Sequence, residues 1–151
     1  MSLEQEVELI RRIPIFKKID LAMLKLLCFS SERLTFEPGQ VLFNEGDIGD
    51  AAYVVIEGSV AVSVATPKGP LVVQTLGTSE LVGEIAIFVD IPRTATVTAA
   101  TRVEALRIAK DQFMGVIREN PDAALELIRI LASRLAATTA RLTKSLAEKR
   151  A

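Results

Sequence analysis

The sequence of 151 residues has no histidine and a single cysteine, Cys28. Without histidine the chain has no Ser-His or Cys-His nucleophile pair, no His-based zinc site and no imidazole proton shuttle. One cysteine cannot form an intramolecular disulfide, which agrees with a reducing cytosol, and we interpret Cys28 as a small buried hydrophobe at the end of a helix. We therefore predict that the chain is not an enzyme and holds neither a metal nor a cofactor.

The chain also lacks an excess of charge of either sign. The 18 basic and 19 acidic residues give a formal net charge of −1, which provides no basic field to attract nucleic acid. No apolar run approaches the roughly 18 residues that span a bilayer. The N-terminal segment MSLEQEVELIRR is charged throughout and does not resemble a signal peptide. These features predict a cytoplasmic protein without a membrane partner.

The middle of the chain has the two-residue period of β-strands, and both ends have helical spacing. Short alternating runs are separated by turns at residues 37–40, at Gly46 and at residues 67–69. The predicted strands are 31–37, 41–47, 51–58, 59–65, 70–76, 94–100 and 103–109. Regularly spaced short strands favour a roll or sandwich over a βαβ sheet.

We therefore predict a mainly β fold in a single domain over residues 1–151. It comprises short N-terminal helices in 1–28, an antiparallel, jelly-roll-like β-roll in 29–109 and two C-terminal helices in 110–151, the last one long. Asp20 is a plausible N-cap of the second N-terminal helix.

Two helix starts are predicted after the last strand. Asp111 is a plausible N-cap for a short helix. Asn120 and Pro121 suit the cap and first position of a second helix, which we expect to run to about Lys149. A seam with alternating three- and four-residue spacing follows that helix: Ile128, Leu131, Leu135, Thr138 and Leu142. So small a body cannot cover so long a helix, and we predict a homodimer through it; packing of the seam on its own roll is the alternative.

The stretch VGEIAIFVDIPRTATVTAA, residues 82–100, carries the main functional pattern. Gly83 permits a tight bend, and the residues after it can form one helical turn whose first amides point outward. Such an end attracts an anion, and Arg93 offers a planar fork of donors that suits a phosphate. The other members of this predicted cradle are Ile85, Ala86, Thr94 and Ala95.

Glu84 needs a separate explanation, because a carboxylate beside an anion site is repulsive. A sugar hydroxyl near the phosphate would give this carboxylate a hydrogen bond to accept. A phosphate on Arg93 and a ribose on Glu84 together describe a nucleotide, and the short segment suits a small cyclic phosphate better than a dinucleotide. The alternative is that Glu84 and Arg93 pair across a loop that binds nothing.

Within this segment, residues 82–97 resemble the phosphate-binding cassette of the cyclic nucleotide-binding domains. That cassette looks like F-G-E-[LMI]-A-L, a variable turn and P-R-[AST]-A-T-V, and the chain has VGEIAIF and IPRTATV in these places. Residues 36–62 and 120–142 are similar to other parts of the same family. The resemblance implies that Glu84 holds the ribose 2′-hydroxyl and that Arg93 holds the cyclic phosphate. It also implies help from the amides of Ile85, Ala86 and Ala95.

For the base, we favour cAMP over cGMP. Thr94 occupies a position where a hydroxyl can bond the 2-amino group of a syn guanine, yet bacterial members with Ser or Thr there respond to cAMP. Thr138 and Thr139 fall where the catabolite activator protein has a Thr-Ser pair that touches adenine across its dimer. Otherwise both are ordinary helix residues.

The resemblance implies a regulatory sensor in which ligand binding shifts the C-terminal helices. The chain ends before the place of a DNA-binding domain, so a fused or separate effector is expected to read the shift. The alternatives are a ligand-independent protein-interaction module of the same fold and a relative that binds another small anion.

Overall fold

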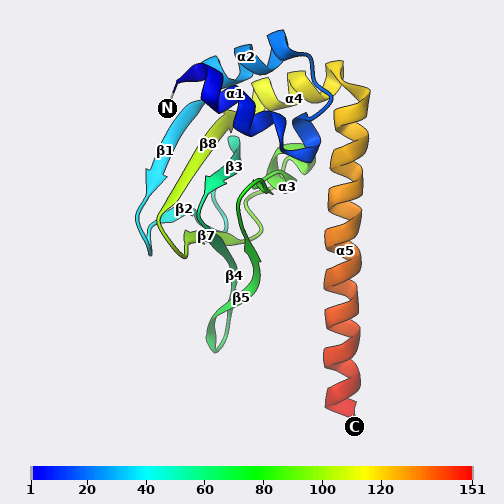
Figure 1. Ribbon diagram of the computed structural model, residues 1–151. Helices are drawn as coiled ribbons and strands as arrows, with labels where there is room; N and C mark the ends of the chain where they lie inside the picture. Colours follow the sequence, from blue (N-terminus) through cyan, green and yellow to red (C-terminus); the bar gives the residue numbers. More distant parts are fainter. Residues whose placement is uncertain (1, 151) are drawn as a thin grey trace.

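Two four-stranded antiparallel sheets form the body of the protein, with helices packed outside one of them (Figure 1). The structure is a computed structural model that describes residues 2–150; residues 1 and 151 of the predicted domain lie outside that range. The first sheet has the order β1 (Glu32–Phe36), β8 (Val103–Ala109), β3 (Ala51–Glu57) and β6 (Leu81–Val82). The second has the order β2 (Val41–Phe43), β7 (Thr96–Ala99), β4 (Val60–Thr66) and β5 (Gly69–Leu76). The predicted antiparallel β-roll is confirmed.

Two details of the strands differ from the prediction. Strand β2 ends at Phe43 and not at residue 47, because the loop that follows it is hydrogen-bonded to the backbone of Arg93. The amide of Gly46 donates to the carbonyl of Arg93 (2.9 Å), and the amide of Arg93 donates to the carbonyl of Asp47 (2.7 Å). Strand β6 was not predicted, since two residues are too few to show a period.

Most of the helices come from the two ends of the chain, and α3 lies between β6 and β7. They are α1 (Leu3–Arg11), the 3₁₀ helix η1 (Pro14–Phe16), α2 (Leu21–Ser30), α3 (Ile85–Val89), α4 (Lys110–Glu119) and α5 (Pro121–Arg150). The prediction that Asp111 caps α4 is wrong, because the N-cap is Ala109 and Asp111 lies in the first turn. There its charge favours the positive helix end instead. Within residues 2–150, no helix has the length and apolarity that crossing a bilayer requires.

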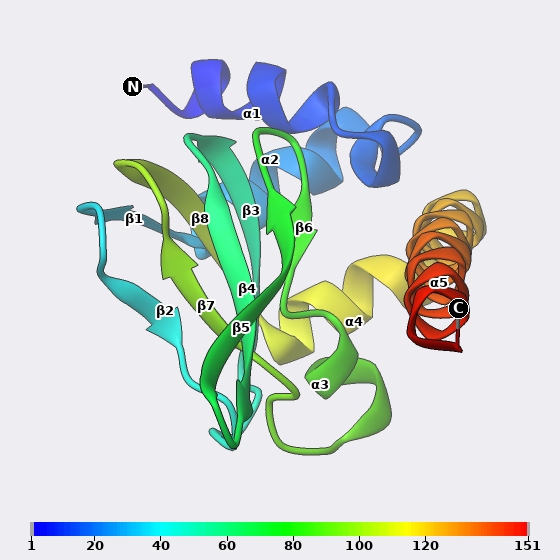
Figure 2. The same cartoon turned by 90° about the horizontal axis from the view of Figure 1, so that it is seen from below.

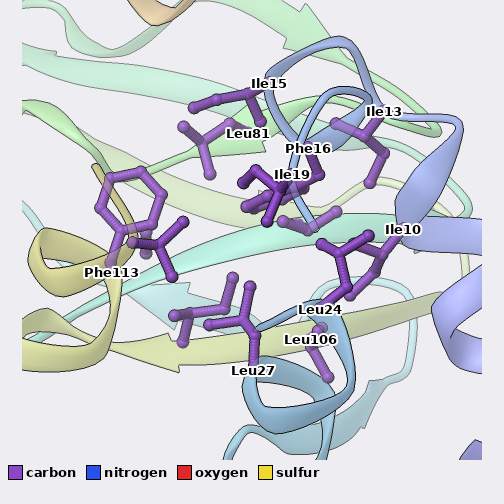
Figure 3. Close-up of a cluster of buried hydrophobic side chains, with 14 of the residues drawn as sticks. Ile10, Ile13, Ile15, Phe16, Ile19, Leu24, Leu27, Leu81, Leu106 and Phe113 are labelled. Atoms are coloured by element: carbon purple, nitrogen blue, oxygen red, sulfur yellow. The ribbon is translucent and has the colours of Figure 1, made fainter. Parts of the chain in front are cut away.

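Strand β3 belongs to two hydrophobic cores, which explains its continuous apolar sequence. Ala52 and Val54 face the helices, whereas Tyr53 and Val55 face the other sheet. The core under the helices includes the residues labelled in Figure 3, contributed by α1, η1, α2, α4 and the first sheet. Cys28 lies in this core, as predicted, and burial raises the pKa of its thiol to about 11.

Helix α5 starts against the body and continues past it (Figure 1); seen from below, it stands beside the roll, next to α4 (Figure 2). Its first part packs on η1 and α4, and Leu127 is buried in the core. Further along, Leu135 and Leu142 are 67% and 59% exposed. In the same stretch, Nη1 of Arg141 donates to the carbonyl of Val73 on β5 (2.8 Å), at a bulge in the β4–β5 ladder. The helix is therefore tied to the β4–β5 hairpin but leaves its apolar seam uncovered.

Candidate functional site

A cavity of about 420 Å³ lies between the second sheet, the segment after β6 and helix α5. Its polar part is formed at Gly83, Glu84 and Arg134. Its apolar part is formed by side chains of both sheets and of α5. The lining residues are Phe43, Val62, Gln74, Leu76, Val82, Gly83, Glu84, Ile85, Ala86, Thr94, Ala95, Val97, Leu131, Arg134, Leu135 and Thr138. This is the size and composition of a small-ligand site.

The polar end begins at Gly83, which joins β6 to α3. Its φ of +86° lies in the region that favours glycine, and a Cβ there would be 2.6 Å from Nη1 of Arg93. The next residue, Glu84, is the N-cap of α3, and its carbonyl accepts the amides of Ile87 (3.1 Å) and Phe88 (3.2 Å). The predicted single helical turn is present, with the amides of Ile85 and Ala86 ahead of its first internal hydrogen bonds.

The Glu84 carboxylate is held by Arg134 from helix α5. Nη1 of Arg134 donates to Oε1 of Glu84 at 2.8 Å, and its Nη2 donates to the carbonyl of Leu81 at 2.8 Å. Glu84 is only 3% exposed, and burial raises the pKa of its carboxyl group although Arg134 opposes the shift. The buried carboxylate of a residue that lines a cavity is suited to accept further hydrogen bonds from a hydroxyl.

Arg93 is also buried, but its guanidinium turns away from the cavity. Its Nη1 and Nη2 donate to the carbonyls of Gly83 and Ala51, both at 2.6 Å, and its Cζ lies 4.0 Å from the centroid of the Phe43 ring. Burial is the main cause that lowers the pKa of this group, and it is opposed by acidic neighbours that include Asp50. The side chain borders a second hollow, behind Gly83, instead of the cavity with Glu84.

The structure therefore brings most of the predicted residues together and separates two of them. Of the residues predicted to bind a ligand, those that line the cavity are Gly83, Glu84, Ile85, Ala86, Thr94, Ala95 and Thr138. Arg93 lies just behind Gly83, and the exposed Thr139 is not among the lining residues. Because Gly83 both lines the cavity and accepts from Arg93, the guanidinium is one carbonyl away from the same space.

Sequence reasoning missed Arg134 and Gln74. Arg134 lies one helical turn before Thr138, so a search for polar side chains on the face of Thr138 would have found it. Gln74 gives no such signal, since it follows Val72 and Val73 in a run that reads as an ordinary apolar strand.

Comparison with known proteins agrees with the family resemblance seen in the sequence. The family model described as "Cyclic nucleotide-binding domain" matches residues 33–120. A Mycobacterium tuberculosis protein named "CRP-like cAMP-activated global transcriptional regulator" is 32% identical over 132 residues, which cover 87% of this chain and 59% of that protein. The chain thus spans about three fifths of the length of this relative.

Two solved structures have a similar fold. The sensor domain of the transcriptional regulator DNR from Pseudomonas aeruginosa superposes with a TM-score of 0.79 at 24% identity, covering 88% of this chain and 90% of that one. The regulatory domain of Toxoplasma gondii PKA, crystallised with cAMP, gives a TM-score of 0.69 at 26% identity, covering 76% and 44%. The first shows that the β-roll with a long C-terminal helix is an established fold.

Proposed function

Since the chain belongs to the cyclic nucleotide-binding domain family, we propose that it binds a cyclic nucleotide, cAMP in preference to cGMP, and passes the binding event to helix α5. The observation that carries this proposal is the pair of buried charges at Gly83. Glu84 and Arg93 are each 3% exposed; Glu84 lines the mostly apolar cavity, and Arg93 lies behind Gly83, one carbonyl away from it. Buried charged groups with shifted pKa values beside a cavity are typical of functional sites.

Two parts of such a ligand, the ribose and the cyclic phosphate, bind at the polar end of the cavity. The ribose 2′-hydroxyl donates to the carboxylate of Glu84, a residue that lines the cavity. The cyclic phosphate meets the amides of Ile85 and Ala86 and draws the Arg93 fork away from the Gly83 carbonyl. A bidentate contact with an anion replaces two neutral acceptors and offsets the desolvation that lowers the pKa of this guanidinium. Thr94 and Ala95 line the same end and add a hydroxyl and an amide.

Arg134 supplies the link from ligand to helix. In the structure it holds α5 to the cassette through Glu84 and through the Leu81 carbonyl. A ribose hydroxyl on Glu84 shares that carboxylate with Arg134, so the ligand changes the strength of one of the contacts that position α5. The ligand shifts the equilibrium between two positions of the helix, and the size of that shift is set by the difference in its affinity for the two. This role is regulatory and makes or breaks no covalent bond.

The uncovered seam on α5 supports the second part of the proposal, a homodimer. Ile128, Leu135 and Leu142 are between 59% and 67% exposed, and they lie on the face where a second copy would form a two-stranded coiled coil. In that dimer Thr138 and Thr139 stand close to the cavity from both helices and contact the base. A fused or separate effector reads the helix position.

The test is calorimetric titration of the folded, nucleotide-free protein with cAMP and, separately, with cGMP. We expect saturable binding of both, tighter for cAMP, and at least tenfold weaker binding after Arg93→Ala, because the phosphate loses its bidentate partner. Arg129→Ala, which removes an arginine that is 64% exposed, is the matched control and should bind as the wild type does. Absence of heat with both nucleotides would refute the proposal. It would favour the interaction module, or another small anion if a metabolite titrates instead.

A further inference from the structure

Helix α2 has an apolar face that the rest of the described chain leaves uncovered. Its sequence is LAMLKLLCFS, with Lys25 as its one charged residue, so the helix is apolar on all sides. The side chains that it buries in the core under the helices are Leu24, Leu27 and Cys28. On the opposite side, Leu26 and Phe29 are 69% and 80% exposed. A helix that is apolar all round is normally covered on both sides, so this face calls for a partner.

The exposed face of α2 has the form of two neighbouring ridges. Residues four apart in sequence lie above one another on a helix, and every member of both ridges is exposed. One ridge is Leu21, Lys25 and Phe29, and the other is Ala22, Leu26 and Ser30. Ridges of large and small side chains at this spacing are the surface against which a second helix packs. The shape of this face therefore fits a helix.

The face is separate from the nucleotide site. In Figure 1, α2 lies at the outer end of the body, opposite to the direction in which α5 extends. Another side of the helix contacts the junction of α4 and α5, where Nδ2 of Asn120 donates to Sδ of Met23 at 3.0 Å. Neither Leu26 nor Phe29 lines the cavity that contains Glu84. A partner can therefore bind this face without blocking the cavity.

The surroundings of this face are basic. Between residues 11 and 29 the only acidic side chain is Asp20, and the basic ones are Arg11, Arg12, Lys17, Lys18 and Lys25. The whole chain, by contrast, has a net charge of −1. Within residues 2–150, no carboxylate lies within ion-pair distance of the three lysines, which are all exposed. These ammonium groups attract a negatively charged partner and would repel the same face of a second copy.

We propose that this face of α2 is a docking surface for an acidic amphipathic helix of a partner protein. The apolar residues of that helix, spaced three and four apart, pack on Leu26 and Phe29. Its carboxylates pair with Lys25, which lies within the apolar face, and with Lys17 and Lys18 just before the helix begins. This inference goes beyond the proposed function and does not depend on it, because Leu26 and Phe29 lie outside the nucleotide cavity.

A membrane with anionic lipids is the other surface that attracts lysines and exposed apolar side chains. A helix that lies in a bilayer interface has an apolar face opposite a strongly charged one. In α2 the side opposite Phe29 is buried in the protein core instead. Lys25 also lies between apolar residues of the exposed face, where insertion into lipid costs free energy. A protein partner fits better, because its carboxylate can meet this ammonium group at a fixed place.

The experiment uses two synthetic peptides of about 20 residues, long enough to form a helix. The first has leucines at three- and four-residue spacing on one face and glutamates on both flanks, and the second has lysine in place of each glutamate. Fluorescence anisotropy of the labelled peptides measures their dissociation constants with the full chain. Amide chemical-shift changes in nuclear magnetic resonance spectra locate the surface that each peptide contacts.

Two double variants and one matched control are compared with the wild type. Leu26→Ser with Phe29→Ser removes the apolar contacts, and Lys17→Glu with Lys25→Glu reverses the charge. The control, Leu71→Ser with Val72→Ser, removes two exposed apolar side chains of strand β5. Circular dichroism confirms that each variant is folded, and a nucleotide titration of each should match the wild type. That titration separates this inference from the proposed function.

The glutamate peptide should bind the wild type and the control equally and shift amide signals of residues 17–30. It should bind Leu26→Ser with Phe29→Ser at least about tenfold more weakly. The charge-reversed variant should prefer the lysine peptide. No binding to the folded wild type, shifts confined to other residues, or equal binding to the wild type and the Leu26→Ser variant would overturn the inference.

Two other occupants of the face are distinguished by the same variant. If the wild type sediments with vesicles that contain phosphatidylserine and Leu26→Ser with Phe29→Ser does not, the face binds lipid and the inference is overturned. If that variant loses a self-association of the wild type in sedimentation equilibrium, the face binds a second copy, which also overturns the inference.

Discussion

The ion pair between Glu84 and Arg134 makes Arg134→Gln an informative perturbation. Nη1 of Arg134 is 2.8 Å from Oε1 of Glu84, and their side chains are 21% and 4% exposed. Removing one partner of a fully buried pair costs about 3–5 kcal/mol, and the partial exposure of Arg134 reduces this to about 2–3 kcal/mol at pH 7.5. The melting temperature should fall by about 4–12 °C.

The loss should also depend on pH, with a sign fixed by the Glu84 carboxyl group. Burial raises its pKa above the ordinary value, and the charge of Arg134 is the first opposing cause. Without Arg134 the pKa rises further. Where the folded pKa exceeds the unfolded one, the folded state binds the proton more tightly, so the cost of burying the carboxylate is complete above the folded pKa. That cost disappears as the pH falls to the unfolded value. The gap between wild type and Arg134→Gln should therefore narrow as the pH is lowered toward about 5.

Urea unfolding followed by far-ultraviolet circular dichroism measures both effects, since the chain has no tryptophan. The double variant Glu84→Gln with Arg134→Gln should lose less than the sum of the single variants, because no unpaired charge remains. Arg129→Gln is the control, since its ion pair with Glu126 is on the surface. Additive losses in the double variant, or an equal gap at both pH values, would show that the pair does not act as described.

Two further predictions concern the cassette and the seam. Gly83→Ala should lower the free energy of unfolding by about 2–3 kcal/mol, because its Cβ meets Arg93 in addition to the unfavourable φ. Gly69→Ala, also at positive φ but with open space around it, should cost about 1 kcal/mol, and equal losses would contradict the role of the close approach. Leu135→Asp combined with Leu142→Asp should convert a dimer into a folded monomer by sedimentation equilibrium, since both side chains are exposed in the single chain. A wild-type protein that is already monomeric at high concentration would refute the proposal that the protein forms a dimer through this seam.

The sequence was sufficient for the fold because local signals agreed along most of it. The hairpin turn at Pro67 and Lys68 and the start of α5 at Pro121 follow from backbone preferences that tertiary contacts did not overturn. The cassette was found for the same reason, since Gly83 and its single helical turn are local features. Strand β6 escaped prediction because its two residues are defined by a partner strand far away in sequence.

The direction of the charged side chains could not be predicted. The sequence names Arg93 as a phosphate fork, but which acceptors it meets depends on the carbonyls of Gly83 and Ala51, which the fold brings from separate segments. The same holds for Glu84, whose partner Arg134 lies 50 residues further along the chain, in helix α5. Spacing along the chain carries no information on such distant pairings.

Helix α5 has the proportions of a lever. From Arg134 to its end at Arg150 it extends about 24 Å at 1.5 Å per residue, so a tilt of about 10° at Arg134 would move the far end by about 4 Å. The same tilt would move Arg141 by about 2 Å, more than a hydrogen bond tolerates. The bond from Arg141 to the Val73 carbonyl must then break, or the β4–β5 hairpin must travel with the helix. A small displacement at Glu84 would therefore be amplified along the helix, and the contact between Arg141 and Val73 would couple the β4–β5 hairpin to that movement.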